Sequence, residues 1–185
     1  MPRSLIQPSL EYESSYRAYI QELRDEERYP FPLDFEDADF SSLIDRLADL
    51  RAGRNLPPSI VASSTFWLVG DGEILGVSNL RHSLNHELRR RGGHIGLGIR
   101  PSQRGRGLGT KLMSLTIQEA WKLGIREVHI HCYKANTTSA SLIKANGGTL
   151  ESEVDDLDTG NVIQRFVVVT PNKSLNSDAG KAGAG

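Results

Sequence analysis

A short segment in the middle of the chain combines residue types that bind phosphate. Gln103-Arg104-Gly105-Arg106-Gly107-Leu108-Gly109-Thr110 stands where a helix is predicted to begin, and the first N–H groups of a helix have no partners within it. These donors and the positive end of the helix dipole favour an anion, while glycine lets the backbone curve around oxygens without a Cβ in the way. The segment therefore predicts a pyrophosphate site. The alternative is a glycine turn that only ends the loop and caps the helix.

The spacing of these glycines excludes two better-known phosphate loops. A dinucleotide-binding fingerprint needs G-x-G-x-x-G, but Thr110 occupies the last position counted from Gly105, and Leu112 occupies it counted from Gly107. A Walker A loop needs Gly-Lys-Ser/Thr, whereas here Gly109 is followed by Thr110 and then Lys111. The loop is therefore of neither type.

The segments that flank the loop must position it. Ile95, Leu97 and Ile99 alternate with other residues over 93–100 and predict a strand, and an apolar stripe from 107 to 124 predicts a helix. Glycine within a strand marks a bulge or the close approach of a ligand or another backbone. The other predicted elements are helices over 13–28, 40–50 and 138–146 and strands over 65–69, 74–80, 128–133, 149–154 and 162–170.

Two motifs in this order resemble the GNAT superfamily of acyl-CoA-dependent N-acyltransferases. Arg104-x-x-Gly107-x-Gly109 is similar to the family's R/Q-x-x-G-x-G/A signature, and the segment from Asn136 to Gly148 is similar to its second motif. The resemblance covers residues 65–169, and the run around Asn79 to Asn85 resembles a bacterial branch of predicted acetyltransferases. The second motif departs from the family because Ile143 stands in place of a tyrosine and Gly148 in place of a phenylalanine.

The resemblance implies an α+β fold of the GNAT type. We expect a mixed, twisted sheet of six to seven strands, flanked by helices and splayed between its fourth and fifth strands. A single domain is expected over 1–171, with a helical acceptor-side segment at 1–56 and a sheet and CoA-binding core at 65–170. Residues 172–185, rich in Ser, Gly, Ala and Lys, are expected to be disordered.

The resemblance also implies acetyl-CoA as cosubstrate. Its pantetheine arm is expected to lie along Leu97, Gly98 and Ile99 like an added strand. The pyrophosphate is expected on the loop, and further contacts are expected from the second motif. The remaining expected cofactor residues are thus Arg104, Gly105, Arg106, Gly107, Leu108, Gly109, Thr110, Asn136, Ser139 and Lys144. The reaction would be direct attack of a primary amine on the thioester within a ternary complex.

The catalytic residues are predicted less directly. His94 is the first candidate base, since it occupies the position of a glutamate in a related branch of the family and an imidazole suits proton transfer near pH 7. The alternative is a polar residue satisfied at a strand start. Because the family tyrosine is missing, either Tyr133 or water protonates the leaving thiolate, or it leaves unassisted. Arg81, His82 and His131 are expected to line the substrate cavity.

Charge along the chain suggests the kind of acceptor. The net charge is −1, which gives no sign of a nucleic-acid or anionic-membrane partner. Residues 1–50 carry five Arg and twelve acids, whereas 81–111 carry eight basic residues and one acid. We expect an acidic acceptor side for a cationic amine such as a polyamine, an aminoglycoside or a peptide amine. A non-catalytic acyl-CoA-binding module and a nucleotide binder unrelated to CoA are the alternatives.

The cysteine content and the apolar stretches suggest the setting. The single cysteine, Cys132, cannot form an internal disulfide, and a cytoplasmic location is expected. No Cys/His spacing is typical of a metal site, so no metal is expected. No apolar stretch is long enough for a membrane span. The protein is expected to be a monomer or a homodimer.

Overall fold

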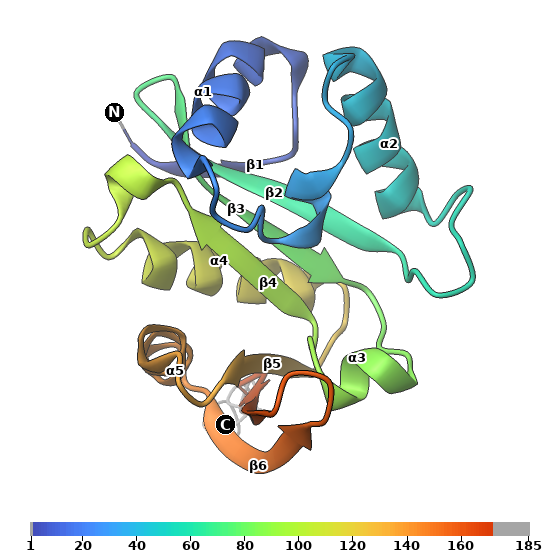
Figure 1. Ribbon diagram of the computed structural model, residues 1–185, viewed down its shortest axis with the longest axis vertical. Coiled ribbons are helices and arrows are strands. Elements are labelled where there is room, and N and C mark those ends of the chain that lie inside the picture. The colour runs from blue at the N-terminus through green and yellow to red at the C-terminus, as the bar shows by residue number, and fades with distance from the viewer. Residues whose placement is uncertain (1, 172–185) are drawn as a thin grey trace, which may run out of the picture.

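The computed structural model describes residues 2–171, and the expected disordered tail at 172–185 lies outside them. Figure 1 shows the strands and helices of the chain. The strands are β1 (Ser4–Ile6), β2 (Ser63–Gly70), β3 (Glu73–Arg81), β4 (Ile95–Ile99), β5 (Glu127–Tyr133), β6 (Thr149–Asp156) and β7 (Asn161–Val169). The helices are α1 (Glu13–Leu23), α2 (Phe40–Ala52), α3 (His86–Arg90), α4 (Leu108–Lys122) and α5 (Thr137–Ala145).

The strands form two sheets instead of one continuous sheet. Strands β1, β2, β3 and β4 lie in that order in the first sheet, and β5, β7 and β6 form the second. Within residues 2–171, each pair of neighbouring strands in these sheets is antiparallel. The two sheets meet where β4 and β5 come together at a single bridge between Gly93 and Ile130. The predicted splay between the fourth and fifth strands is therefore present.

Helices cover both faces of the first sheet. Figure 1 shows α1 and α2 on one side of it and α4 on the other. Trp67 of β2 is completely buried beneath α1 and α2, where its ring packs against Tyr16 and Phe40. On the other side, α4 buries Leu112 and Met113 against the sheets. Burial of apolar surface on both faces stabilises the sheet that carries β4.

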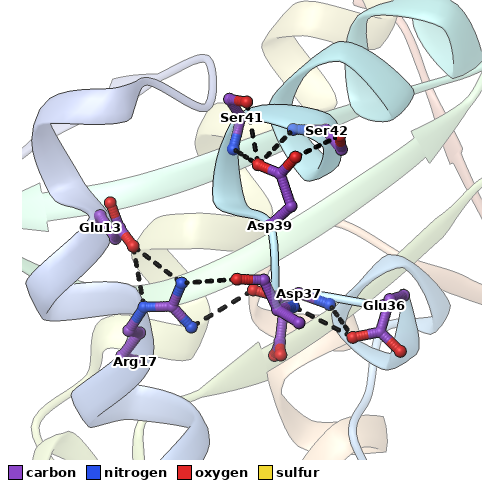
Figure 2. A network of polar contacts seen from close by, with 8 residues as sticks. Glu13, Arg17, Glu36, Asp37, Asp39, Ser41 and Ser42 are labelled. Atoms are coloured by element: carbon purple, nitrogen blue, oxygen red, sulfur yellow. Dashed lines mark hydrogen bonds and ion pairs between the residues drawn. The ribbon is translucent and has the colours of Figure 1, made fainter.

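Capping residues explain why α2 begins where it does. The Asp39 carboxylate accepts hydrogen bonds from the backbone N–H groups of Ser41 and Ser42, at 3.0 and 3.3 Å, which satisfies donors that the helix itself leaves free. Figure 2 shows this cap beside the Arg17 guanidinium, which pairs with Glu13 at 2.7 Å. The acidic residues 1–50 therefore make polar contacts among themselves at the cap of α2 and within α1.

Three elements differ from the sequence-based expectations. Helix α1 ends at Leu23 and not at residue 28, because residues 24–28 are all charged and offer no apolar side chain to bury, and Arg24 takes a left-handed φ of 49°. Strand β1 and helix α3 were not predicted. Both are too short to produce a clear hydrophobic period: β1 has three residues and α3 has five.

No helix within residues 2–171 is long and apolar enough to cross a bilayer.

Candidate functional site

A large cavity opens beside the diverging ends of β4 and β5. Its volume is about 1150 Å³. One wall consists of the end of β4, the glycine-rich loop and the N-terminal turns of α4 and α5, and the facing wall consists of α1 and the segment after it. The lining residues are Tyr19, Leu23, Glu26, Glu27, Tyr29, Leu97, Gly98, Ile99, Gln103, Arg104, Gly105, Gly107, Leu108, Gly109, Thr110, Asn136, Thr137, Thr138, Ser139, Ser141, Leu142 and Ala145.

The glycine-rich loop leaves backbone donors open to this cavity. Gly105 and Gly107 take left-handed φ angles of 74° and 71°, and a Cβ at either position would meet no atom within 4 Å. Gly107 is the N-cap of α4, and no side chain caps this helix. The N–H groups of Leu108, Gly109 and Thr110 therefore lack helical partners. Free donors, open space and the positive helix end fit a phosphate group.

The outer edge of β4 offers a strand that a ligand can extend. Arg100 donates its backbone N–H to Leu75 of β3 at 3.0 Å, so ladder alternation turns the backbone groups of Gly98 toward β3 and those of Leu97 and Ile99 away from it. The Ile99 carbonyl on this outer edge accepts a hydrogen bond from Arg104 Nε at 3.1 Å. The N–H and C=O of Leu97 therefore face the gap between β4 and β5, as an extended pantetheine arm would require.

The glycines inside β4 make room for a tyrosine. A Cβ on Gly96 would lie 2.5 Å from the Tyr29 hydroxyl, and a Cβ on Gly98 would overlap the Tyr29 carbonyl oxygen. The sequence left open a bulge, a ligand or another backbone at these glycines, and on the face of the strand it is the Tyr29 side chain and backbone that come close. Tyr29 lies against that face at Gly96 and Gly98, and the residues Leu97 to Ile99 line the cavity.

The N-terminus of α5 is capped, in contrast to that of α4. Asn136 Oδ1 accepts the Ser139 backbone N–H at 3.0 Å, so the Asn136 side chain stabilises the helix whether or not it also contacts a ligand. Thr138, Ser141 and Leu142 of the same turns line the cavity and were missed. Their position after the capping asparagine was the signal available in the sequence.

Two predicted cofactor residues lie outside the cavity. Arg106 donates to Gln103 Oε1 at 3.2 Å. Lys144 points to the other side of α5, where its Nζ lies 6.0 Å from the centroid of the Phe166 ring. Because successive residues of a helix point to different faces, the position of Lys144 in the motif did not place its side chain at the site.

His94 lies at the apex where β4 and β5 meet. Its side chain is only 7 % exposed, and its Nδ1 accepts the His129 backbone N–H at 3.0 Å. The neutral ring then carries its proton on Nε2, so neither nitrogen has a free lone pair. Burial, aided by His129, Arg81 and Arg89, lowers the pKa of His94 to about 4. The structure therefore opposes the predicted role of His94 as general base.

Tyr133 is also poorly placed for the predicted acid role. Its hydroxyl donates to Asp156 Oδ2 at 3.1 Å, and the residue does not line the cavity. Asp156 also receives Arg91 at 3.0 Å. The Tyr133 hydroxyl is therefore already engaged by a carboxylate, and the source of the proton for the leaving thiolate stays a prediction.

Of the predicted substrate residues, Arg81 and His131 lie near Gly93 beside the apex, whereas His82 contacts Ser64. Arg81 donates to the Gly93 carbonyl at 3.0 Å, and burial lowers its pKa. His131 is largely buried, and burial, aided by His129, lowers its pKa to about 4. His82 Nε2 lies 2.8 Å from Ser64 Oγ. None of the three lines the cavity, so a substrate role for them stays a prediction.

The two opposite charge blocks form ion pairs with each other. Arg100, whose side chain is 7 % exposed, pairs with Glu22 of α1 at 2.7 Å and with Glu73 at 3.4 Å. Arg104 pairs with Glu26 at 2.6 Å. The acidic and basic blocks therefore partly neutralise each other and do not form wholly separate acceptor and cofactor surfaces.

Two further residues of the facing wall were not predicted. Tyr29 and Glu27 line the cavity. The sequence placed Glu27 near the end of the predicted helix over 13–28 and left Tyr29 in the proline-rich segment after it. Nothing in their spacing indicated that this loop lies across β4. Within residues 2–171, no cluster of three or more His, Cys, Asp or Glu side chains is arranged to hold a metal ion.

The seven strands, the splay and the glycine loop at a helix N-terminus define a GNAT-type fold with an anion-binding cavity. The sequence model of the acetyltransferase (GNAT) family matches residues 16–147. Comparison with curated proteins gives no match. The chain belongs to the GNAT family of acetyltransferases.

Solved structures with similar folds include three acetyltransferases. The microcin C7 self-immunity acetyltransferase MccE, in complex with acetyl-CoA and AMP, is 18% identical, with 91% of this chain and 92% of that chain covered and a TM-score of 0.65. The ribosomal-protein-S5-alanine acetyltransferase from Vibrio fischeri is 15% identical, with coverage of 92% and 94% and a TM-score of 0.69. The dodecameric spermidine N-acetyltransferase from Vibrio cholerae is 14% identical, with coverage of 95% and 98% and a TM-score of 0.64.

Proposed function

We propose that the protein transfers an acetyl group from acetyl-CoA to a primary amine. The observation that carries this proposal is the uncapped N-terminus of α4, where Gly105 and Gly107 leave space for the pyrophosphate. The outer edge of β4, at Leu97, supplies an N–H and a C=O to the pantetheine arm. The complex of MccE with acetyl-CoA shares this fold and supports the proposal by similarity.

Positioning supplies most of the catalysis in this proposal. Holding the amine against the thioester avoids the entropic cost of bringing two molecules together, which contributes up to about 7–11 kcal/mol in well-oriented systems. No lone pair of His94 is free to take the amine proton, since Nδ1 accepts a backbone N–H. Water in the cavity takes that proton, and the amine attacks in its neutral form. The rate is therefore expected to rise with pH toward the pKa of the amine.

In this proposal the acceptor carries a second, protonated amino group besides the one that is acetylated. The Glu27 carboxylate binds this second group. Glu26 and Glu27 both line the cavity, but Glu26 is paired with Arg104. No basic side chain within residues 2–171 forms an ion pair with Glu27. Among structures of similar fold, one acetylates spermidine and another the alanine of a ribosomal protein. The acceptor classes considered are polyamines, aminoglycosides and peptide amines.

The test is thiol release from acetyl-CoA with a panel of amines. Spermidine, an aminoglycoside and a basic peptide are compared with neutral and acidic amines of similar size. Activity only on the neutral or acidic amines would contradict the cationic acceptor. Glu27→Gln should raise KM for the preferred amine without changing the affinity for CoA, and Glu36→Gln, an exposed carboxylate outside the cavity, is the matched control.

A second candidate is a non-catalytic acyl-CoA-binding module. It is favoured by the replacement of the family tyrosine by Ile143, which is buried, and by the engaged Tyr133 hydroxyl. Both functions require CoA binding, so turnover separates them: the module binds acetyl-CoA and releases no thiol with any amine. Stronger thermal protection by ATP than by acetyl-CoA would instead indicate a nucleotide binder.

The cytoplasmic location belongs to the same proposal. Cys132 is a free thiol, which suits a reducing compartment. The expected monomer or homodimer stays a prediction, which light scattering at several concentrations tests.

A further inference from the structure

The apex between β4 and β5 is closed by a side chain in place of a backbone group. His94 donates its N–H to the His129 carbonyl at 2.7 Å. In return, the His129 N–H donates to the imidazole Nδ1 of His94 at 3.0 Å, not to a β4 carbonyl. The His94 carbonyl is turned to the first sheet, where it accepts the Arg81 N–H at 2.8 Å. The backbone of His94 is thus hydrogen-bonded both to β5, through His129, and to β3, through Arg81.

Neighbouring residues explain why a side chain completes this pairing. Gly93 has a left-handed φ of 66°, and a Cβ there would lie 2.5 Å from the His129 carbonyl oxygen. The left-handed turn brings β5 into close contact and then bends β4 away from it. Beyond this point no described β4 residue pairs with β5, so the imidazole makes the last connection before the strands diverge.

We propose that His94 is a positioning residue that fixes the angle at which β4 and β5 diverge. Its imidazole Nδ1 substitutes for a missing carbonyl, satisfies the His129 N–H and ends the pairing at the residue before the gap. The width of that gap determines whether one ligand can contact both the backbone of Leu97 in β4 and the N-terminal turn of α5. The consequence for affinity rests on the proposed binding of acetyl-CoA.

Substitutions that keep or remove the acceptor atom test this role. The amide oxygen of His94→Asn lies close to the place of Nδ1 and should still accept the His129 N–H, whereas His94→Leu offers no acceptor. We expect His94→Leu to weaken CoA binding about tenfold, which is the loss of roughly one hydrogen bond at the gap, and His94→Asn to retain affinity and most of kcat. Rescue by asparagine separates positioning from proton transfer, because asparagine carries no base.

Hydrogen exchange at the His129 amide reports on the connection itself. In the ligand-free protein, exchange at this amide should speed up in His94→Leu and remain slow in His94→Asn. This measurement needs neither cofactor nor turnover, so a wild-type protein that acetylates nothing would defeat the proposed function and leave this result standing. If His94→Leu does not fold, His94→Gln replaces it, since its longer side chain moves the acceptor away from Nδ1.

A matched control separates this role from general destabilisation. Asp39→Ala removes the α2 cap far from the cavity and should lower Tm with unchanged affinity for CoA. Two outcomes would overturn the proposal. One is unchanged CoA affinity and unchanged His129 exchange in the variant without the acceptor; the other is loss of kcat in His94→Asn equal to that in His94→Leu, with affinity retained.

Discussion

The two walls of the cavity satisfy their polar groups in opposite ways. On the wall of α4, the loop around Gly105 and Gly107 leaves backbone donors without partners. On the wall of α1 and the segment after it, Glu26 is paired with Arg104, and Glu22 of α1, which does not line the cavity, is paired with Arg100. Unpaired donors beside open space are costly unless a ligand or water takes them. The α4 wall is therefore the one we propose to bind the ligand, whereas the carboxylate of Glu26 on the facing wall holds Arg104.

The same contrast appears between two helix N-termini. Helices α4 and α5 both begin at the cavity, but Asn136 caps α5 and no side chain caps α4. A family motif at a helix start therefore has two possible meanings. It supplies either a site for an anion or the residue that makes the helix begin.

The largest expected effect comes from giving α4 a carboxylate at its N-terminus. Gly107→Asp places a negative charge where the phosphates bind, and the space beside Gly107 is open enough to admit it. Repulsion and occupation of the free N–H groups should weaken CoA binding by at least about a hundredfold, measured by calorimetry. Gly107→Asn has the same shape without the charge, and equal loss in both variants would contradict an electrostatic site.

Acid should destabilise the apex that joins the two sheets. His94 has a pKa of about 4, lowered first by burial, whereas an unfolded histidine titrates near 6.5. Between these values only the unfolded chain takes up the proton, so stability falls as the pH drops from about 6.5 to 4, by roughly 3 kcal/mol for this histidine. His129, His131, Arg81 and Arg89 are the charged or titratable groups around it.

Urea unfolding at a series of pH values measures this effect. In His94→Asn the slope of stability between pH 6.5 and 4 should be smaller than in the wild type. An identical slope would show that the pKa of His94 is the same in the folded and the unfolded protein, and not lowered by folding.

A smaller effect is expected at the glycine face of β4. Gly96→Ala should cost about 1–3 kcal/mol of stability, because the new Cβ would lie 2.5 Å from the Tyr29 hydroxyl. The same substitution in a Tyr29→Ala protein should cost much less, since the obstructing ring is gone. Chemical denaturation of the wild type, the two single variants and the double variant gives this comparison. Equal losses of stability with and without the Tyr29 ring would mean that Tyr29 does not lie against Gly96.

Removing the α5 cap should have a still smaller effect. Asn136→Ala should lower stability by about 1 kcal/mol, a typical value for a lost N-cap. If the cap is the main role of Asn136, the affinity for CoA changes little. A loss of affinity much larger than the loss of stability would instead support the cofactor contact predicted from the motif.

The smallest effect tests the facing wall. Glu26→Gln removes the carboxylate that holds Arg104 and faces the phosphate loop. CoA binding should strengthen by a few-fold, since the arginine is freed and one like charge is removed near the phosphates. Glu36→Gln, outside the cavity, should leave the affinity unchanged, and weaker binding in Glu26→Gln would mean that the ion pair positions Arg104 for the ligand.

The sequence predicted most of the elements and the loop because these depend on local patterns. The hairpin of β2 and β3, the strand before the loop and helix α4 all have a clear period or cap. Tyr29 and Glu27 could not be predicted, since no local pattern says that the segment after α1 crosses β4. The directions of the Lys144 and Tyr133 side chains could not be predicted either, because they depend on contacts with Phe166 and Asp156, which are distant in the sequence.

The sequence by itself determined where an anion can bind, because glycine spacing and a helix start are properties of consecutive residues. Only the tertiary structure decided which polar groups remain free for a ligand. Arg100 and Arg104 look equivalent in the basic block, yet α1 brings Glu22 to one and Glu26 to the other. His94 resembles a base until β5 brings the His129 N–H to its lone pair. A partner that is distant in sequence therefore determines whether each of these groups does chemistry or holds the fold.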